Sequence, residues 1–290
     1  MLAIWYILSQ TLYGWGSDAV VQYRYSLCGQ AIHRGWKYAK STGSRHTMRP
    51  TNSSIILQDY WEQGISETCP VFNAHAHHGT YGAIYFPDGG SADAMVTAMD
   101  RAGVRVAVVS SHEALNDPIN GNHVTASVIA AYPDRFRGWL VANPLYPQQI
   151  AKDLEKFEDW QAQGFVGFKI HPGWQQYPLT GPNYRPLFAY AEQRGIPILS
   201  HTWGEDPFCG SVQVREIVEA YPTIPFLAGH AIHGEWDQGI SIARKHPNLY
   251  LELTAAYSVN GVLEHLVAGV GADRILFGDD LPWFDPMHGI

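Results

Sequence analysis

The sequence predicts an α/β protein built on a closed (β/α)₈ barrel, the TIM-barrel architecture, on the basis of two observations. Eight short apolar runs recur between positions 71 and 277, without the polar alternation of half-exposed strands. Helix-like stretches separate most of them, an order typical of parallel strands joined by crossover helices. The runs are Val71–Ala74, Val104–Ser110, Gly138–Ala142, Phe165–Ile170, Ile196–Ser200, Phe226–Ala228, Leu249–Leu253 and Ile275–Phe277.

Eight strands in one unit favour a closed barrel over a doubly wound open sheet, and no GxGxxG motif follows the first run. The first expected helix has an N-cap serine, Ser91, and ends before Gly103. Few residues follow the eighth run before Ile290, so the eighth helix is expected to be missing or truncated. The expected helices are Ser91–Arg101, Gln148–Gln163, Pro186–Arg194, Ser211–Ala220, Glu235–Lys245 and Val262–Ala268.

Residues 1–69 differ from the rest and are expected to form an N-terminal extension to the barrel of residues 70–290. The extension is rich in Tyr, Trp, Ser and Gln, and its one helix-like stretch runs from Gln58 to Gln63. It is expected to pack on the barrel, where it could cover the gap left by the eighth helix, or to be partly disordered. Its apolar start, MLAIWYIL, lacks the basic residues and cleavage site of a signal peptide and is interpreted as a packing segment.

The composition argues against several classes of partner. The 290 residues carry a net charge of −8, whereas nucleic-acid binding needs clustered positive charge. No apolar stretch approaches the ~20 residues that span a bilayer, so no membrane partner is expected. Cys28, Cys69 and Cys209 show no CxxC spacing, which favours a reducing, cytoplasmic location over a disulfide framework. Because only 16% of the residues are charged, a homo-oligomer that hides apolar surface is a candidate assembly.

Histidine and lysine side chains occur where barrel strands end, which is where barrel enzymes carry their active sites. His75 and His77 are two apart, so on a strand both point to one side and could chelate a metal, although two exposed turn histidines would look the same. Lys169 lies in an apolar run and could be carbamylated and bridge two metals, bind a substrate carboxylate as an ammonium, or reach solvent at the barrel mouth. His171 could be a ligand, a substrate contact or a loop cap.

Three further apolar runs close on a polar residue: His201, His230 and the pair Asp279–Asp280. Each alone fits a structural role as well as a functional one. Together with the histidines already named, however, they would surround a single opening at one end of the barrel, and chance placement explains that poorly.

Over residues 70–290 the sequence resembles the amidohydrolase superfamily, and most closely its amidohydrolase-related branch of metal-dependent TIM-barrel enzymes. The final motif is similar to the FGSDYPW-like motif of that branch, so Asp280 takes the place of the family aspartate and Asp279 stands where Ser or Thr is usual. An Asp often precedes the HxH motif by two positions, and here it is Asn73. The motifs are HAH at 75–77, GFVGFKIHP at 164–172, LSH at 199–201, AGH at 228–230 and ILFGDDLPW at 275–283.

The resemblance implies a role for each site residue. His75, His77 and His201 would be metal ligands, and Asp280 would be both a ligand and a proton acceptor. His230 would polarise the substrate or orient a water molecule, and Lys169 holds the position that in some relatives is a carbamylated bridging ligand. Three imidazoles and a carboxylate suit Zn²⁺ first, with Mn²⁺ or Fe²⁺ as alternatives, and zinc lowers the pKa of bound water from 15.7 toward ~7.

The leading functional hypothesis is metal-dependent hydrolysis of a C–O or C–N bond in a small cyclic or carboxylated substrate, such as a lactone or amide, and the lysine of the GFKIHP segment favours it. The alternative is non-oxidative decarboxylation of an unsaturated or aromatic acid, and the third is an inactive barrel that acts as a binding protein. Beside His171, four loop aromatics are candidate substrate contacts, although loop packing explains them equally well: Trp174, Tyr177, Trp203 and Trp283.

Overall fold

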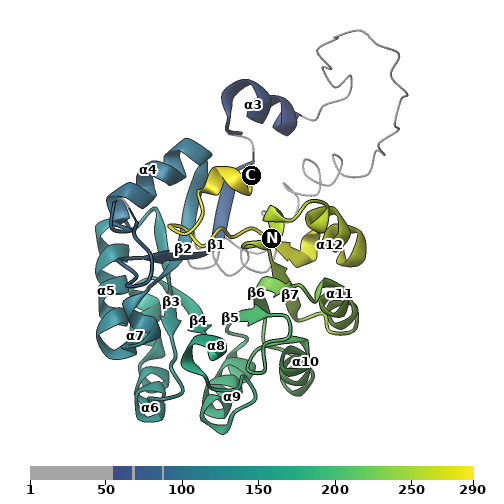
Figure 1. The fold of residues 1–290 in the computed structure, drawn as a ribbon. Coiled ribbons are helices and arrows are strands. Elements are labelled where there is room, and N and C mark those ends of the chain that lie inside the picture. Colours follow the sequence, from purple (N-terminus) through teal and green to yellow (C-terminus); the bar gives the residue numbers. More distant parts are fainter. Residues whose placement is uncertain (1–54, 67–68, 87) are drawn as a thin grey trace.

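The computed structural model describes residues 55–66, 69–86 and 88–290, and in them eight parallel strands form one sheet in the order β1 to β8. Figure 1 shows the strands gathered in a ring with the helices around the outside. The predicted barrel is therefore confirmed. The strands are β1 (Val71–His78), β2 (Val104–Ser111), β3 (Phe136–Val141), β4 (Phe165–Ile170), β5 (Ile198–Trp203), β6 (Phe226–His233), β7 (Leu249–Glu252) and β8 (Ile275–Leu276).

The α-helices agree with the sequence in most gaps between strands, with three differences. A four-residue helix directly after β4, Pro172–Gln175, was not expected. A helix between β2 and β3 went unpredicted, and the single helix expected over Gln148–Gln163 is two, because Lys156 leaves the helical range with φ −112° and ψ 17°. The helices are α3 (Ile55–Gln63), α4 (Ala92–Ala102), α5 (Pro118–Ala131), α6 (Pro147–Glu155), α7 (Phe157–Ala162), α8 (Pro172–Gln175), α9 (Arg185–Arg194), α10 (Ser211–Ala220), α11 (Trp236–Lys245) and α12 (Val262–Val270).

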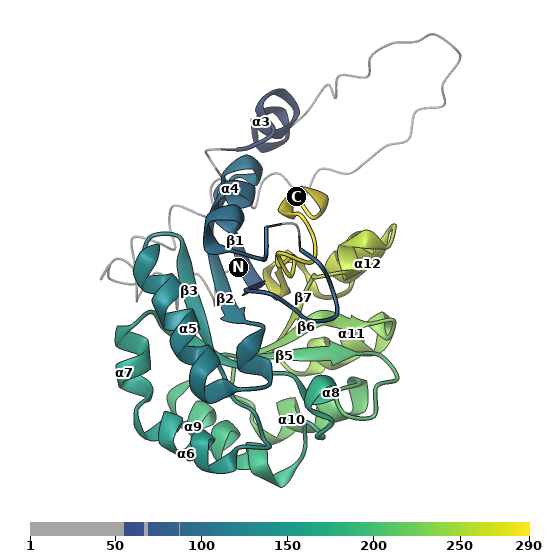
Figure 2. The ribbon, with the colours of Figure 1, turned by 60° about the vertical axis from the view of Figure 1, so that its left-hand side comes forward.

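The ring closes between β1 and the segment that follows the two-residue strand β8. Phe277 accepts a hydrogen bond from the backbone N–H of Ala74 (2.9 Å), and Leu281 accepts one from that of His77 (2.7 Å). After this segment, the described residues 282–290 contain only the short 3₁₀ helix η5 (Pro286–His288), as the missing eighth helix predicts. Residues 282–290 lie beside α4 in both ribbon views, and Asp285 forms an ion pair with Arg101 of α4 (Figure 2).

Two apolar layers hold the barrel together. A large outer layer packs the helices on the strands, and a small inner cluster fills the barrel interior around Trp139. The indole N–H of Trp139 donates to the Ala74 carbonyl (2.9 Å), so this buried polar group is satisfied. The inner cluster therefore fills the interior of the barrel as far as Ala74 on β1, and His75 is the next residue along that strand.

The N-terminal extension is described only in part. Helix α3 includes the stretch expected to be helical at Gln58 to Gln63. The apolar start of the chain and Cys28 lie outside the described residues, so their roles stay predictions. Over the part of the chain that the structure describes, every helix is too short or too polar to cross a lipid bilayer.

Candidate metal centre

Strand β1 carries His75 and His77 into the barrel, and both side chains are buried. The pairing with β2 slips between Asn73 and Ala76, which marks a bulge, a device that often re-aims side chains at active sites. Nε2 of His75 lies 3.4 Å, and Nε2 of His77 3.2 Å, from Oδ1 of Asp280. The two histidines therefore meet a carboxylate that is 205 and 203 positions away from them in the sequence.

Asp280 reaches this position because its own backbone is bonded to β1. Its N–H donates to the His75 carbonyl (2.9 Å), and its φ of 59° turns the chain sharply. Burial raises the pKa of the Asp280 carboxyl, but His75 and His77 outweigh burial and hold it well below its usual range. The carboxylate is therefore ionised and aimed at the imidazoles.

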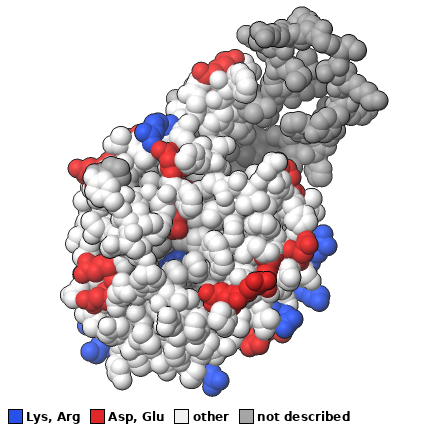
Figure 3. All heavy atoms as spheres, viewed as in Figure 1, with Lys and Arg blue, Asp and Glu red and all other residues white. Residues whose placement is uncertain are grey.

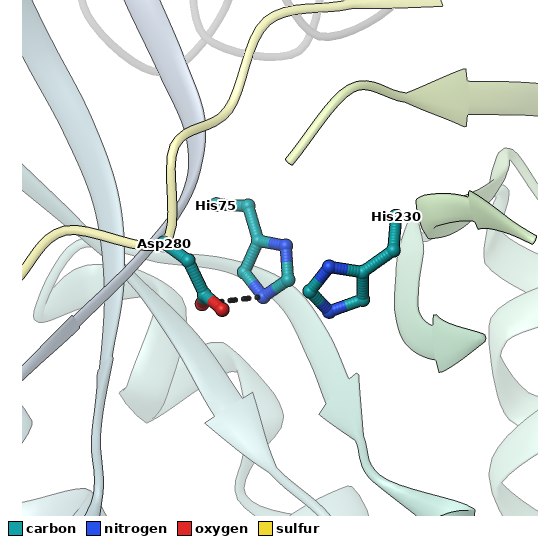
Figure 4. Close-up of side chains that lie close together, drawn as sticks. All are labelled: His75, His230 and Asp280. Carbon is teal, nitrogen blue, oxygen red and sulfur yellow. Dashed lines mark ion pairs between the residues drawn. The ribbon is translucent and has the colours of Figure 1, made fainter. Parts of the chain in front are cut away.

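His230 completes the group from strand β6. The possible ligand atoms of His75, His230 and Asp280 all lie within 4.8 Å of one another, and Figure 4 shows the three side chains converging from β1, from β6 and from the segment after β8. Among the described residues, Nδ1 of His230 and Oδ1 of Asp280 are buried without a hydrogen-bond partner. Two imidazoles and an ionised carboxylate with unused lone pairs fit a divalent cation.

The other predicted ligands lie next to this group rather than within it. His77 contacts Asp280, and its Nδ1 lies 3.1 Å from the Ser110 hydroxyl. The His201 ring lies 4.5 Å from the His230 ring and stacks on the His171 ring at 3.9 Å. His201 on β5 and His171 directly after β4 can stack because β4 and β5 are neighbours in the sheet. The group of side chains whose ligand atoms lie within 4.8 Å of one another thus includes His230, which was expected to polarise the substrate or orient a water molecule.

Lys169 points from β4 into the same group and is 1% exposed. Its Nζ lies 2.6 Å from Nε2 of His75. Burial lowers the pKa of Lys169 to about 8, and Asp280 and Glu252 oppose that shift. Of the three alternatives for Lys169, the one in which it reaches solvent at the barrel mouth does not fit this burial, and the other two stay open.

Aromatic rings surround the opening above these side chains. The Tyr81 ring lies 5.4 Å from that of Trp174 and 4.9 Å from that of Trp283, and the Trp203 ring stacks on His233 at 4.2 Å. Figure 3 shows this face as mostly uncharged, with acidic and basic groups at its margin and in a central hollow. The substrate contacts expected of Trp174, Trp203 and Trp283 stay a prediction.

Tyr177 has a different environment from the other predicted aromatic contacts. Its ring packs on Tyr184 at 5.7 Å, and its hydroxyl accepts a hydrogen bond from the N–H of Asn183 (2.9 Å). These contacts fasten the loop after β4, so loop packing explains this residue best.

Two residues of the site were missed from the sequence: Glu252 and His112. Oε2 of Glu252 lies 2.7 Å from Nδ1 of His75, and the carboxylate is fully buried. The His112 ring stacks on His77 at 4.9 Å, and its Nε2 accepts a hydrogen bond from the Trp283 indole (2.9 Å). Both are polar residues at the ends of apolar runs, the same signal that identified His201 and His230.

Comparison with solved structures finds the same fold at low sequence identity. An uncharacterised TIM-barrel protein from Bordetella bronchiseptica is 20% identical, with a TM-score of 0.61 over 76% of this chain and 89% of that one. A 2,6-dihydroxybenzoate decarboxylase from Rhizobium is 16% identical, with a TM-score of 0.60 over 76% and 90%. A dihydroxybenzoic acid decarboxylase from a Polaromonas species, with bound manganese and 2-nitroresorcinol, is 19% identical, with a TM-score of 0.60 over 76% and 89%.

A search of curated proteins found no match. The family model described as amidohydrolase matches residues 73–289, a range that contains the barrel and every candidate ligand. That match spans well over half of the 290 residues and agrees with the geometry of the centre, so the chain belongs to the amidohydrolase family.

Proposed function

We propose that this chain is a metal-dependent enzyme that releases CO₂ from an aromatic acid without oxidation. The observation that carries the proposal is the buried Lys169, whose ammonium lies beside His75 and the other candidate ligands and can neutralise a substrate carboxylate. Two proteins of similar fold are named as decarboxylases of dihydroxybenzoic acids, and they supply the substrate class to test first.

The reaction replaces a carboxylate on a ring carbon with hydrogen. The bond between the ring and the carboxylate breaks, CO₂ leaves, the electron pair stays on the ring carbon, and a proton is added there. A divalent cation would supply positive charge that holds negative oxygens of the substrate. Lys169 would pair with the carboxylate, and Tyr81, Trp174 and Trp283 would contact the ring.

The identity of the metal is part of this proposal. His75, His230 and Asp280 offer nitrogen and oxygen donors that suit Zn²⁺, Mn²⁺ and Fe²⁺ alike. The sequence favoured zinc, but the similar Polaromonas enzyme holds manganese, so Mn²⁺ is the first ion to test and Zn²⁺ the second.

Hydrolysis of a lactone or amide is the second candidate, and the state of Asp280 favours it. Its ionised carboxylate lies beside His75 and His77, where it can accept a hydrogen bond from a water molecule held in the centre and orient that water for attack. Lys169 favoured hydrolysis in the sequence, but its burial beside His75 places its ammonium where a substrate carboxylate could pair with it, which is why it supports decarboxylation first.

The two reactions are separated by their products. Protein loaded with Mn²⁺ would be incubated with 2,6-dihydroxybenzoate and, separately, with a panel of lactones and amides. We expect one CO₂ for each aromatic acid consumed, measured by headspace mass spectrometry. Ring opening or amide cleavage without CO₂ would support hydrolysis. A chain that binds no metal and turns over no substrate would support the inactive binding protein.

Replacing Lys169 with Met is expected to raise KM for the aromatic acid about 10- to 100-fold, because a hydrogen bond to a charged group contributes about 1.5–3 kcal/mol. The amount of Mn²⁺ bound per chain, measured by elemental analysis, should not change. The control is Lys152→Met, which removes an exposed lysine of α6. A loss of bound metal in K169M alone would instead identify Lys169 as a bridging ligand.

A further inference from the structure

Glu252 lies at the end of β7, and its carboxylate is fully buried behind the candidate ligands. Its Oε1 accepts hydrogen bonds from the N–H (2.7 Å) and the hydroxyl (2.6 Å) of Thr254. Its Oε2 faces Nδ1 of His75 at 2.7 Å and the backbone N–H of His230 at 3.3 Å. Four donors thus converge on two oxygens, and a carboxylate is the side chain that can accept them all.

This arrangement determines how His75 presents its ring. Because Oε2 of Glu252 also faces the His230 N–H, the bond with His75 is best made by an N–H at Nδ1. The other ring nitrogen, Nε2, then keeps its lone pair, and it points toward Asp280 and Lys169. A carboxylate behind a ligating histidine fixes the tautomer and raises the basicity of the ligating nitrogen.

The same carboxylate supports the backbone that carries His230. His230, Ala231 and Ile232 all have positive φ, of 65°, 51° and 53°, a conformation that residues with a side chain rarely adopt in succession. The Glu252 carboxylate faces the first of these N–H groups, and the Thr202 hydroxyl accepts a hydrogen bond from the third (3.1 Å). The chain can therefore turn here and aim the imidazole inward.

The space around Glu252 also fits this role. A Cβ added to Gly278 would lie 2.2 Å from Oε1 of Glu252 and 2.8 Å from Cβ of His75. Any side chain at position 278 would have to displace the carboxylate or the imidazole. The segment after β8, which carries Gly278 and Asp280, is thus packed directly against the Glu252–His75 pair.

We infer that Glu252 is a positioning residue that holds two of the three candidate ligands, His75 by its ring and His230 by its backbone, in the geometry that binds a cation. It stands in for the carboxylate that Asn73 lacks: Asn73 accepts a hydrogen bond from the backbone N–H of His75 (3.0 Å), while the charged partner of its ring comes from β7. The inference rests on the proposed metal dependence.

The test compares Glu252→Gln with the wild-type chain by competition of Mn²⁺ with a chelator. An amide carries no charge and offers one acceptor oxygen, so we expect Mn²⁺ to bind 10- to 100-fold more weakly. The matched control is Glu192→Gln, because Glu192 also accepts backbone N–H groups, from Thr223 (3.1 Å) and Ile224 (3.1 Å), but lies on α9 outside the centre. E192Q should bind Mn²⁺ like the wild type.

A second measurement uses the metal-free protein, so its result does not depend on the proposed reaction. Nitrogen-15 NMR of the imidazoles should show His75 protonated at Nδ1 in the wild type and partly shifted to Nε2 in E252Q. Should E252Q fail to fold, Thr254→Val removes only the hydroxyl bond to Oε1 and is expected to weaken Mn²⁺ binding by a smaller factor. Wild-type Mn²⁺ affinity and tautomer in E252Q, or wild-type affinity in T254V where E252Q does not fold, would overturn the inference. A wild-type chain that binds no Mn²⁺ but keeps the Nδ1 tautomer would instead contradict the proposed function.

Discussion

Asp280→Asn is expected to lower turnover at least about 10³-fold and to weaken Mn²⁺ binding, while the barrel stays folded. Oδ1 of Asp280 is buried, lacks a hydrogen-bond partner among the described residues, and lies near His75 and His77. Asparagine keeps the shape of the side chain but removes its charge, so the centre loses its anionic ligand. Turnover, bound metal and circular dichroism would be measured on the same preparation.

The neighbouring carboxylate provides the matched control. Asp279 is also buried, but its Oδ1 accepts hydrogen bonds from the Asn73 amide (2.6 Å) and the Leu281 N–H (2.8 Å). In Asp279→Asn an amide oxygen can accept the same two bonds, so we expect metal affinity within about threefold of wild type. Wild-type turnover in D280N, or equal loss of metal in both variants, would show that Asp280 does not have the assigned role.

Trp139→Ala is expected to destabilise the fold by about 3–5 kcal/mol, the usual cost of removing a buried tryptophan. The ring is 1% exposed and packs with the barrel interior, close enough to β4 that a Cβ on Gly167 would lie 2.8 Å from it. The substitution leaves a cavity and also leaves the Ala74 carbonyl without its indole donor. The midpoint of thermal or urea unfolding reports the effect.

Trp61→Ala is the control for this stability prediction. Trp61 lies on α3 and is 81% exposed, so its removal should change stability by no more than about 0.5 kcal/mol. A W139A protein as stable as W61A would mean that the barrel interior does not depend on the indole.

The strands and their order could be predicted because strands buried on both faces are short apolar runs in the sequence, such as Phe165–Ile170. The barrel rule then placed His75, His230 and Asp280 at one opening without any knowledge of their contacts. Helix α5 was missed because its sequence contains Gly121 and β-branched residues, which lower helix propensity. Close packing selects that glycine, since a Cβ there would lie 2.3 Å from the backbone nitrogen of Ala114.

The contacts within the centre could not be predicted, because they depend on tertiary geometry. Glu252 and His75 are 177 positions apart, and only the closed sheet brings them to 2.7 Å. The left-handed backbone at His230 leaves no mark in residue type, since His, Ala and Ile all avoid that region. Choosing His230 rather than His201 as the partner of His75 and Asp280 therefore needed knowledge of the left-handed backbone within β6.

The closure of the barrel has a consequence for how activity would be lost. Asp280 sits on the segment that joins β8 to β1, and its N–H is bonded to the backbone of His75. Opening that seam would part the carboxylate from both histidines in one step, while the remaining strands and helices kept their packing. On gradual heating, activity would then be lost at a lower temperature than the helical circular dichroism signal, because the barrel opens locally at this seam before the whole fold unfolds.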